Sequence, residues 1–250
     1  MKCKLISNLG NDLTVVNSAR VSFDKHSDRI DARDQAKTFI YAFIYGAGAT
    51  KIGSIVGGKD KNLIKYLAKH KHFTPFTHCV ITLLEEVPIF VARQRFKHTV
   101  GFSYNEVSRR YVDSDPVFFH PDEWRKRAEN NAENKKNNAE NKKQGSEDFA
   151  IPSQQLTNKQ YDEFIFKSKE LYDFMLSMSI APEQARMVLP QSTYTSYYVT
   201  GSLAAFARAY KLRIDEHAQK EIQYLAKMWN DVIEPLYPTS WAALIGENND

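Results

Sequence analysis

The sequence predicts an α+β fold: a helix-rich single domain with an antiparallel sheet. Two stretches, 79–87 and 192–200, have the β-branched, aromatic and alternating content that is typical of strands. After residue 150, most of the chain shows apolar residues at helical spacing instead. With 250 residues, 42% of them hydrophobic and 26% charged, the chain is long enough to enclose a sizeable core.

Composition and charge narrow the functional classes. The formal net charge of +4 suits anionic ligands without requiring nucleic acid. Cys3 and Cys79 cannot make a disulfide framework, which indicates the reducing environment of a cytoplasm. No apolar run reaches the length of a membrane span, and no signal-peptide core follows the first residues. We therefore expect a cytoplasmic protein with no membrane partner.

The N-terminal elements follow from short patterns. Residues 2–23 indicate two strands, KCKLIS and LTVVNSARVSF, joined by the turn NLGND. Residues 60–72 have the pattern of a short amphipathic helix, and HFTPFTH at 72–78 is a turn fixed by Pro75. Two histidines of this turn are six residues apart, but no thiol or carboxylate pattern completes a metal site, so we expect no metal.

The stretch 90–111, FVARQRFKHTVGFSYNEVSRRY, concentrates basic side chains, hydroxyls and aromatic rings. Pro88 suits the start of a helix, which we expect to end near Gly101, with SYNEVSRRY returning as a loop or short turn. Arginine offers a planar fork to phosphate, and hydroxyl groups can complete the shell around an anion. A solvated basic face is the plain alternative. The interleaved aromatic residues favour a binding site, because a solvated face does not need them.

The C-terminal half is mostly helical. Thr157 and Gln160 indicate a capping box ahead of a long helix. Pro182 opens a short helix, Ser202 can cap another, and the last helix stops at Pro235. The apolar residues of the first of these helices recur at helical spacing, and they are Tyr161, Phe164, Ile165, Tyr172 and Met175.

Two segments differ from the rest of the chain. Residues 31–58 carry Arg33, Lys37 and Tyr45-Gly46 at spacings that resemble the fingers helix of family A DNA polymerases. Because a polymerase palm has no counterpart here, we interpret this segment as a mosaic insertion of viral or phage type that adds only an amphipathic helix. Residues 125–149 repeat Ala-Glu-Asn and Asn-Lys-Lys, and we expect a mobile polar loop or frayed helix.

Six short motifs together carry a second resemblance, which covers about 180 residues. They occur in the order ARVSF, HFTPFTH, FVARQ, NEVSRRY, ARMVLP and LRIDEHAQKEI. In this order they resemble the flavin-dependent thymidylate synthases. The chain departs from that family at Lys97-His98-Thr99, where the family has Arg-His-Arg, and one extra residue precedes Ser108.

The resemblance implies a reaction, cofactors and an assembly. The reaction is reductive methylation of dUMP to dTMP, with methylenetetrahydrofolate as carbon donor, NADPH as reductant and bound FAD as the hydride relay. Family members are homotetramers whose sites are shared between subunits, so we expect the same here, in a cytoplasm (the host's if the source is viral). Neither Cys3 nor Cys79 suits the thiolate attack that the other kind of thymidylate synthase uses.

The resemblance also assigns residues to roles. Arg110, Arg186 and Arg213 are expected around the dUMP phosphate. Arg213 and Ser108 are the candidate catalytic residues, although Ser108 has no visible base and is better regarded as a ligand. The expected dUMP ligands are Gln94, Glu106, Ser108, Arg109, Arg110, Arg186 and Arg213. The expected FAD ligands are Ser22, His72, Thr74, Lys97, His98, Thr99, Glu106, Arg208 and His217.

Two other functions remain compatible with the residues. The altered motif at 97–99 and the segment 31–58 also fit a degenerate homologue that binds flavin or nucleotide without turnover. The basic stretches also fit a nucleic-acid-binding protein, although the glutamates interspersed in 125–149 argue against a basic tail.

Overall fold

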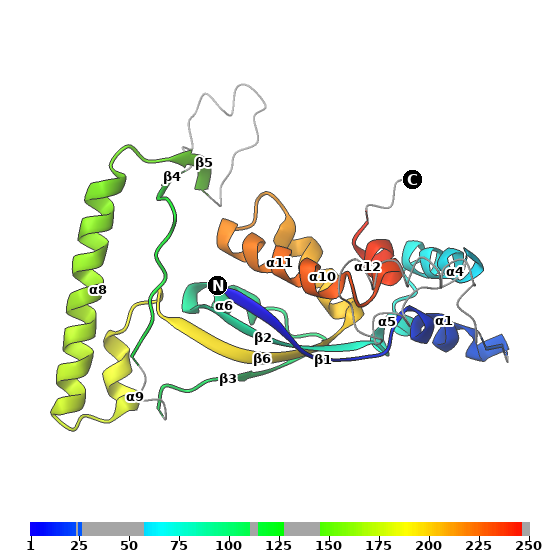
Figure 1. The fold of residues 1–250 in the computed structure, drawn as a ribbon, viewed down its shortest axis with the longest axis horizontal. Helices are drawn as coiled ribbons and strands as arrows, with labels where there is room; N and C mark the ends of the chain where they lie inside the picture. Colours follow the sequence, from blue (N-terminus) through cyan, green and yellow to red (C-terminus); the bar gives the residue numbers. More distant parts are fainter. Residues whose placement is uncertain (24, 27–57, 111–114, 128–145, 247–250) are drawn as a thin grey trace, which may run out of the picture.

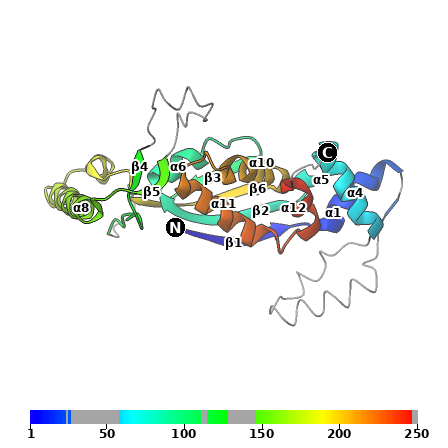
Figure 2. The same cartoon turned by 90° about the horizontal axis from the view of Figure 1, so that it is seen from above.

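A four-stranded antiparallel sheet runs through the centre of the molecule in the order β1–β2–β6–β3 (Figure 1). The computed structural model describes residues 1–23, 25–26, 58–110, 115–127 and 146–246. The strands of this sheet are β1 (Lys2–Leu9), β2 (Val80–Pro88), β3 (Phe102–Glu106) and β6 (Tyr194–Ser202). Helices α10 (Leu203–Ile214) and α11 (Lys220–Ile233) lie along one face of the sheet (Figure 2). The predicted α+β class is therefore confirmed.

The core lies between the central strands and these two helices. Alternate residues of β2 are buried, as the pattern at 79–87 predicted. Ile81 and Leu83 of β2 and Val199 of β6 pack in the same cluster as Leu225 and Trp229 of α11. All five side chains are fully buried. The strands predicted at 79–87 and 192–200 thus form the centre of the fold.

The second predicted N-terminal strand is wrong, because its residues form a helix. Helix α1 (Asp12–Arg20) follows β1 directly, and a short 3₁₀ helix, η1 (Val21–Phe23), continues it. The side chain of Asn11 accepts a hydrogen bond from the Thr14 N–H, and the Thr14 hydroxyl accepts one from the Asn11 N–H, each at 3.1 Å. This capping box overrides the strand preference of the β-branched run at 14–16.

Helix α1 is joined to the C-terminal end of the chain by a buried carboxylate. Both oxygens of Asp12 accept backbone hydrogen bonds, from Thr239 at 2.8 Å and from Ser240 at 2.9 Å, at the first turn of α12 (Pro238–Ile245). A carboxylate in this position satisfies N–H groups that a helix start leaves unpaired. Sequence patterns did not predict α12.

The segment after β2 differs from the prediction in two ways. Helix α6 (Ile89–Arg95) begins after Pro88 as expected, but it ends six residues before Gly101. Gly101 instead has a φ of 79° in the turn before β3, a conformation that glycine adopts without strain. The first four residues of the predicted loop SYNEVSRRY instead belong to β3, which pairs with β6 from Phe102 to Glu106, whereas residues 107–110 form a loop and turn as predicted.

The remaining helices lie at the two ends of the sheet (Figure 1). Helix α4 (Gly58–Lys69) confirms the prediction at 60–72, and α5 (Thr74–Thr77) occupies the turn that contains Pro75. Helix α8 (Gln154–Ser177) stands at the opposite end, beside α9 (Pro182–Ala185) and η2 (Arg186–Val188). It begins three residues earlier than the predicted capping box at Thr157, and Phe164 is exposed rather than packed.

Both ends of the polar segment 125–149 form strands, so the prediction of a loop or frayed helix is wrong for these residues. Strands β4 (Arg125–Arg127) and β5 (Ser146–Ala150) pair as a small antiparallel sheet. Arg125 also makes a 2.8 Å ion pair with Glu221 of α11. The polymerase-like segment 31–58, with Arg33, Lys37 and Tyr45-Gly46, lies outside the described residues except for its last residue.

Replacing residues 128–145 by a short Gly/Ser linker should leave the melting temperature unchanged. A segment of this polar composition has few apolar side chains to bury, so we expect a change below about 0.5 kcal/mol. Differential scanning fluorimetry measures it, with a matched deletion that also removes β4 and β5 as the destabilised control. A fall of several degrees with the linker alone would show that this segment packs on the protein.

Candidate functional site

A polar pocket of about 330 Å³ opens beside the end of β3. Three arginines line it: Arg109 and Arg110 follow β3, and Arg186 comes from η2. Among the described lining residues, the single carboxylate is Glu106, which accepts a 2.7 Å hydrogen bond from the Thr195 hydroxyl. Three arginines that line the same pocket as one engaged carboxylate suit a phosphate-sized anion. This pocket, called here the arginine pocket, brings together five of the seven predicted nucleotide ligands.

Ser108 is the fifth of these ligands, and its surroundings bear on its chemistry. Its hydroxyl accepts hydrogen bonds from the backbone N–H of Arg110 at 3.4 Å and from Arg110 Nε at 3.2 Å. No histidine lies among the described residues that line the pocket. A serine nucleophile needs a neighbouring base, so this arrangement favours a ligand hydroxyl.

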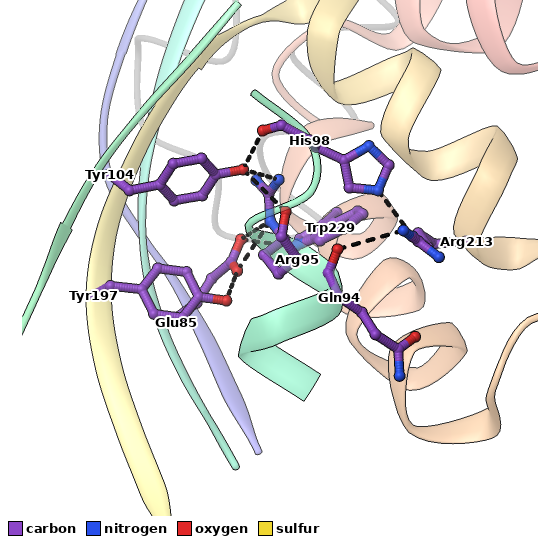
Figure 3. A network of polar contacts seen from close by, with 8 residues as sticks. All are labelled: Glu85, Gln94, Arg95, His98, Tyr104, Tyr197, Arg213 and Trp229. Carbon is purple, nitrogen blue, oxygen red and sulfur yellow. Dashed lines mark hydrogen bonds and ion pairs between the residues drawn. The ribbon is translucent and has the colours of Figure 1, made fainter. Parts of the chain in front are cut away.

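The other two predicted nucleotide ligands form a separate group with His98, called here the α6 cluster. Arg213 Nε donates to His98 Nε2 at 2.8 Å, and Arg213 Nη2 donates to the backbone carbonyl of Gln94 at 3.3 Å (Figure 3). Since Nε2 accepts, His98 is neutral and carries its proton on Nδ1. Burial, together with the charges of Arg213, Arg95 and Arg208, lowers the pKa of His98 to about 4. His98 therefore stays neutral at neutral pH and can hold Arg213.

A buried ion pair lies beneath the α6 cluster. Glu85 of β2 and Arg95 of α6 are both fully buried, and Arg95 Nε lies 3.2 Å from Glu85 Oε2. Glu85 also accepts hydrogen bonds from the Tyr197 hydroxyl at 2.6 Å and from the Trp229 indole at 2.8 Å (Figure 3). A buried carboxylate needs partners of this kind, because its desolvation is otherwise costly. The pair fixes the last turn of α6 against β2, β6 and α11.

Tyr104 of β3 connects this buried pair to the turn that carries His98. Its hydroxyl accepts a 2.6 Å hydrogen bond from Arg95 Nη1 and donates a 2.7 Å hydrogen bond to the His98 carbonyl. The Arg95 guanidinium lies over the ring of Phe102, 4.4 Å from its centroid. The backbone position of His98 is therefore set from the core.

A third group lies at the far end of the sheet, in a cavity of about 470 Å³. Two predicted flavin ligands, His72 and Thr74, line this cavity together with Ser18, Lys71 and His78. Hydroxyl, ammonium and imidazole groups are donors to phosphate and to polar ring edges. The donor set therefore fits part of a flavin nucleotide.

The remaining predicted flavin ligands are dispersed in the chain. Lys97 and Thr99 are exposed in the turn between α6 and β3, and Arg208 of α10 donates to a backbone carbonyl of this turn. His217 follows α10, and its backbone N–H donates to the Asp215 carboxylate. Ser22 lies in η1. A single subunit therefore does not gather the nine predicted flavin ligands at one point.

Sequence reasoning missed the buried pair Glu85–Arg95, although a signal was present. Glu85 occupies the same phase of the alternating strand as Ile81, Leu83 and Val87, and a carboxylate in a buried row requires a partner. The partner could not be chosen from the sequence, because Arg93 and Arg95 lie two residues apart on the same helix.

No helix within the described residues is long and apolar enough to cross a membrane. In the same part of the chain, no three His, Cys, Asp or Glu side chains are grouped as metal ligands would be.

Comparison with known proteins gives a consistent set of relatives. Residues 4–239 match the family described as thymidylate synthase complementing protein. The flavin-dependent thymidylate synthase of Thermosipho africanus is 34% identical over 245 residues, which cover 97% of this chain and 90% of that protein. The enzyme of the same name from Thermosipho melanesiensis is 37% identical over 227 residues, covering 89% of this chain and 81% of that protein.

Solved structures give the same picture. The UMP/dUMP methylase PolB from Streptomyces cacaoi, bound with 5-Br dUMP, is 26% identical with a TM-score of 0.73. The match covers 97% of this chain and 93% of that one.

Proposed function

The chain belongs to the flavin-dependent thymidylate synthases, and from this membership we propose that it catalyses the reductive methylation of dUMP to dTMP. Methylenetetrahydrofolate is the carbon donor, NADPH the reductant and FAD the bound flavin. The observation that carries the proposal is the arginine pocket, where Glu106, Ser108, Arg109, Arg110 and Arg186 surround a space of phosphate-binding character. The likeness to a methylase bound with 5-Br dUMP supports the same substrate.

The donors described above fit a flavin nucleotide in two regions. His72 and Thr74 would hold it in the cavity beside α5, and Lys97, His98, Thr99, Arg208 and His217 would hold it near the α6 cluster. Ser22 and Glu106 complete the proposed set. When bound, the flavin supplies the redox chemistry that the side chains lack.

The protein's own contribution is binding and orientation. Arg109, Arg110 and Arg186 provide charge-assisted hydrogen bonds to the nucleotide phosphate. Ser108 provides a hydroxyl ligand. Arg213 does not line the arginine pocket, so in place of the phosphate role that the resemblance gave it we assign its guanidinium, held by neutral His98, to the reacting end of the nucleotide, where fixed positive charge stabilises developing negative charge.

We propose further that each site is shared between subunits of a homotetramer. In one chain the predicted dUMP ligands fall into two groups, the arginine pocket and the α6 cluster, and Gln94 and Arg213 do not line the pocket. Helix α8 also exposes an apolar stripe beside its buried residues, formed by Leu156, Phe164, Leu171 and Phe174. Such a stripe marks an interaction surface. A second subunit can cover it and bring its own α6 cluster to the pocket.

Subunit complementation tests this shared site. Arg186→Ala damages the pocket and Arg213→Ala damages the α6 cluster, so each variant alone should form little dTMP. In mixed oligomers with random association, about a quarter of the sites should combine an intact pocket with an intact cluster. Activity should therefore reappear when the two variants are unfolded, mixed in equal amounts and refolded together.

The control is a mixture of Arg186→Ala with Arg110→Ala, which damage the same pocket. Every site in this mixture keeps a damaged pocket, so no activity should return. If the mixture of Arg186→Ala and Arg213→Ala also stays inactive although mixed oligomers form, each site lies within one subunit.

The overall function is tested by supplying dUMP, methylenetetrahydrofolate and NADPH to the purified protein and measuring dTMP. A yellow protein that binds dUMP but forms no dTMP would be the degenerate homologue. A colourless protein that binds DNA would be the nucleic-acid-binding alternative.

A further inference from the structure

A chain of polar contacts leads from β4 to the side chain of Gln94. Arg125 Nη2 donates to the two oxygens of Glu221 at 2.8 and 3.0 Å. Gln219 Nε2 donates to Glu221 Oε2 at 2.7 Å. Gln94 Nε2 in turn donates to Gln219 Oε1. These contacts join the small β4–β5 sheet, α11 and α6, which are distant in the sequence.

Each link in this chain fixes the direction of the next. The ionised Glu221 can only accept hydrogen bonds, so it faces the nitrogen of the Gln219 amide. The Gln219 oxygen is left to accept, and Gln94 must therefore turn its own nitrogen toward it. Among the described residues, Gln94 Oε1 accepts no hydrogen bond, so this oxygen is the group that Gln94 can offer to a ligand.

Arg125 and Glu221 are held firmly enough to act as an anchor. Their side chains are only 15% and 7% exposed, and one nitrogen of Arg125, Nη2, donates to both carboxylate oxygens of Glu221. The residue before Arg125 is fixed as well, because the Trp124 N–H donates to the Gln154 side chain at 2.7 Å and the Gln154 amide donates back to the Trp124 carbonyl at 2.7 Å. The anchor is therefore tied to α8.

We propose that Arg125, Glu221 and Gln219 are positioning residues. They present the side-chain oxygen of Gln94, Oε1, to an N–H donor of the substrate base. This inference rests on the proposed function. In dUMP the matching donor is uracil N3–H. The cytosine ring of dCMP has an acceptor at N3 and no hydrogen there, so the same oxygen would face a lone pair. The chain of contacts thus makes Gln94 a determinant of base specificity.

The test compares the affinities of dUMP and dCMP by calorimetry on the flavin-bound protein. The wild type should prefer dUMP. Arg125→Ala leaves Glu221 without its cation, and Gln219→Ala removes the link while leaving the Arg125–Glu221 pair intact. Gln219→Ala frees the Gln94 amide to turn, and Arg125→Ala frees the Glu221 carboxylate to move away from Gln219, which loosens the same link. In both variants the ratio of dUMP to dCMP affinity should therefore fall about three- to tenfold. Lys227→Ala, which removes an exposed cation from the same helix as Glu221, should leave the ratio unchanged.

The outcomes separate this inference from the proposed function. A wild-type protein that binds no dUMP overturns both. If the wild type prefers dUMP and Gln219→Ala keeps the full preference, the positioning role is wrong. The positioning role is also wrong if both variants lose affinity for dUMP and dCMP equally, since a purely structural defect would have that effect.

Discussion

Glu85→Gln should lower the free energy of unfolding by about 3–5 kcal/mol, because it leaves the Arg95 charge buried without its counterion. For a chain of this size the change corresponds to a fall of roughly 6–20 °C in Tm. The carboxylate is fully buried and also bonds Tyr197 and Trp229, so one substitution weakens contacts to three elements. Thermal and urea unfolding of the purified variant measure the effect.

Two further variants isolate the cause. Glu86→Gln changes the neighbouring carboxylate, which is exposed and pairs with exposed Lys2, and it should change stability by less than about 1 kcal/mol. Replacing the whole pair, with Glu85→Leu and Arg95→Met together, should recover much of the lost stability, because no unpaired charge remains. If the double variant is as unstable as Glu85→Gln, the loss does not come from an uncompensated charge.

Arg213→Ala should weaken dUMP binding tenfold or more, since a hydrogen bond to a charged partner contributes about 1.5–3 kcal/mol. In the structure Arg213 is held in place by the His98 side chain and by the backbone carbonyl of Gln94, so its guanidinium is already oriented before substrate binds. Calorimetric titration of dUMP into the flavin-bound variant gives the change in affinity.

Lys211→Ala is the matched control, because Lys211 is an exposed cation on the same helix, two residues before Arg213. It should change dUMP affinity little, as only the general positive field is reduced. An Arg213→Ala protein that keeps flavin and binds dUMP with unchanged affinity would place the nucleotide elsewhere and remove Arg213 from the site.

Local sequence patterns were sufficient to predict the elements that are determined by side-chain alternation or by a capping residue. Strands β2 and β6 follow from β-branched alternation, and α10 follows from the capping side chain of Ser202, which accepts a hydrogen bond from the Ala205 N–H. The family motifs also identified Glu106, Ser108, Arg109, Arg110 and Arg186, which the structure gathers around one pocket. These residues lie on two short segments whose order along the chain could be read directly.

Other features depended on residues far apart in the sequence. Valine and threonine occur in a strand in β6 and in a helix in α1. In α1 the capping box and the docking of Asp12 on α12 outweighed the strand propensity of these residue types. Strand β3 exists because β6, about 90 residues later, offers it an edge. No window of sequence around residues 102–106 contains that partner.

The two arginines of α6 also show that local sequence cannot decide which side chain becomes buried. Arg93 is exposed and Arg95 is fully buried, although they are alike in chemistry and two residues apart. What separates them is Glu85 on the neighbouring strand and Trp229 on α11, which only packing brings together. Sequence alone could therefore predict an anion-binding stretch, whereas which of its arginines is buried and which is exposed followed from the face of the helix that the core covers.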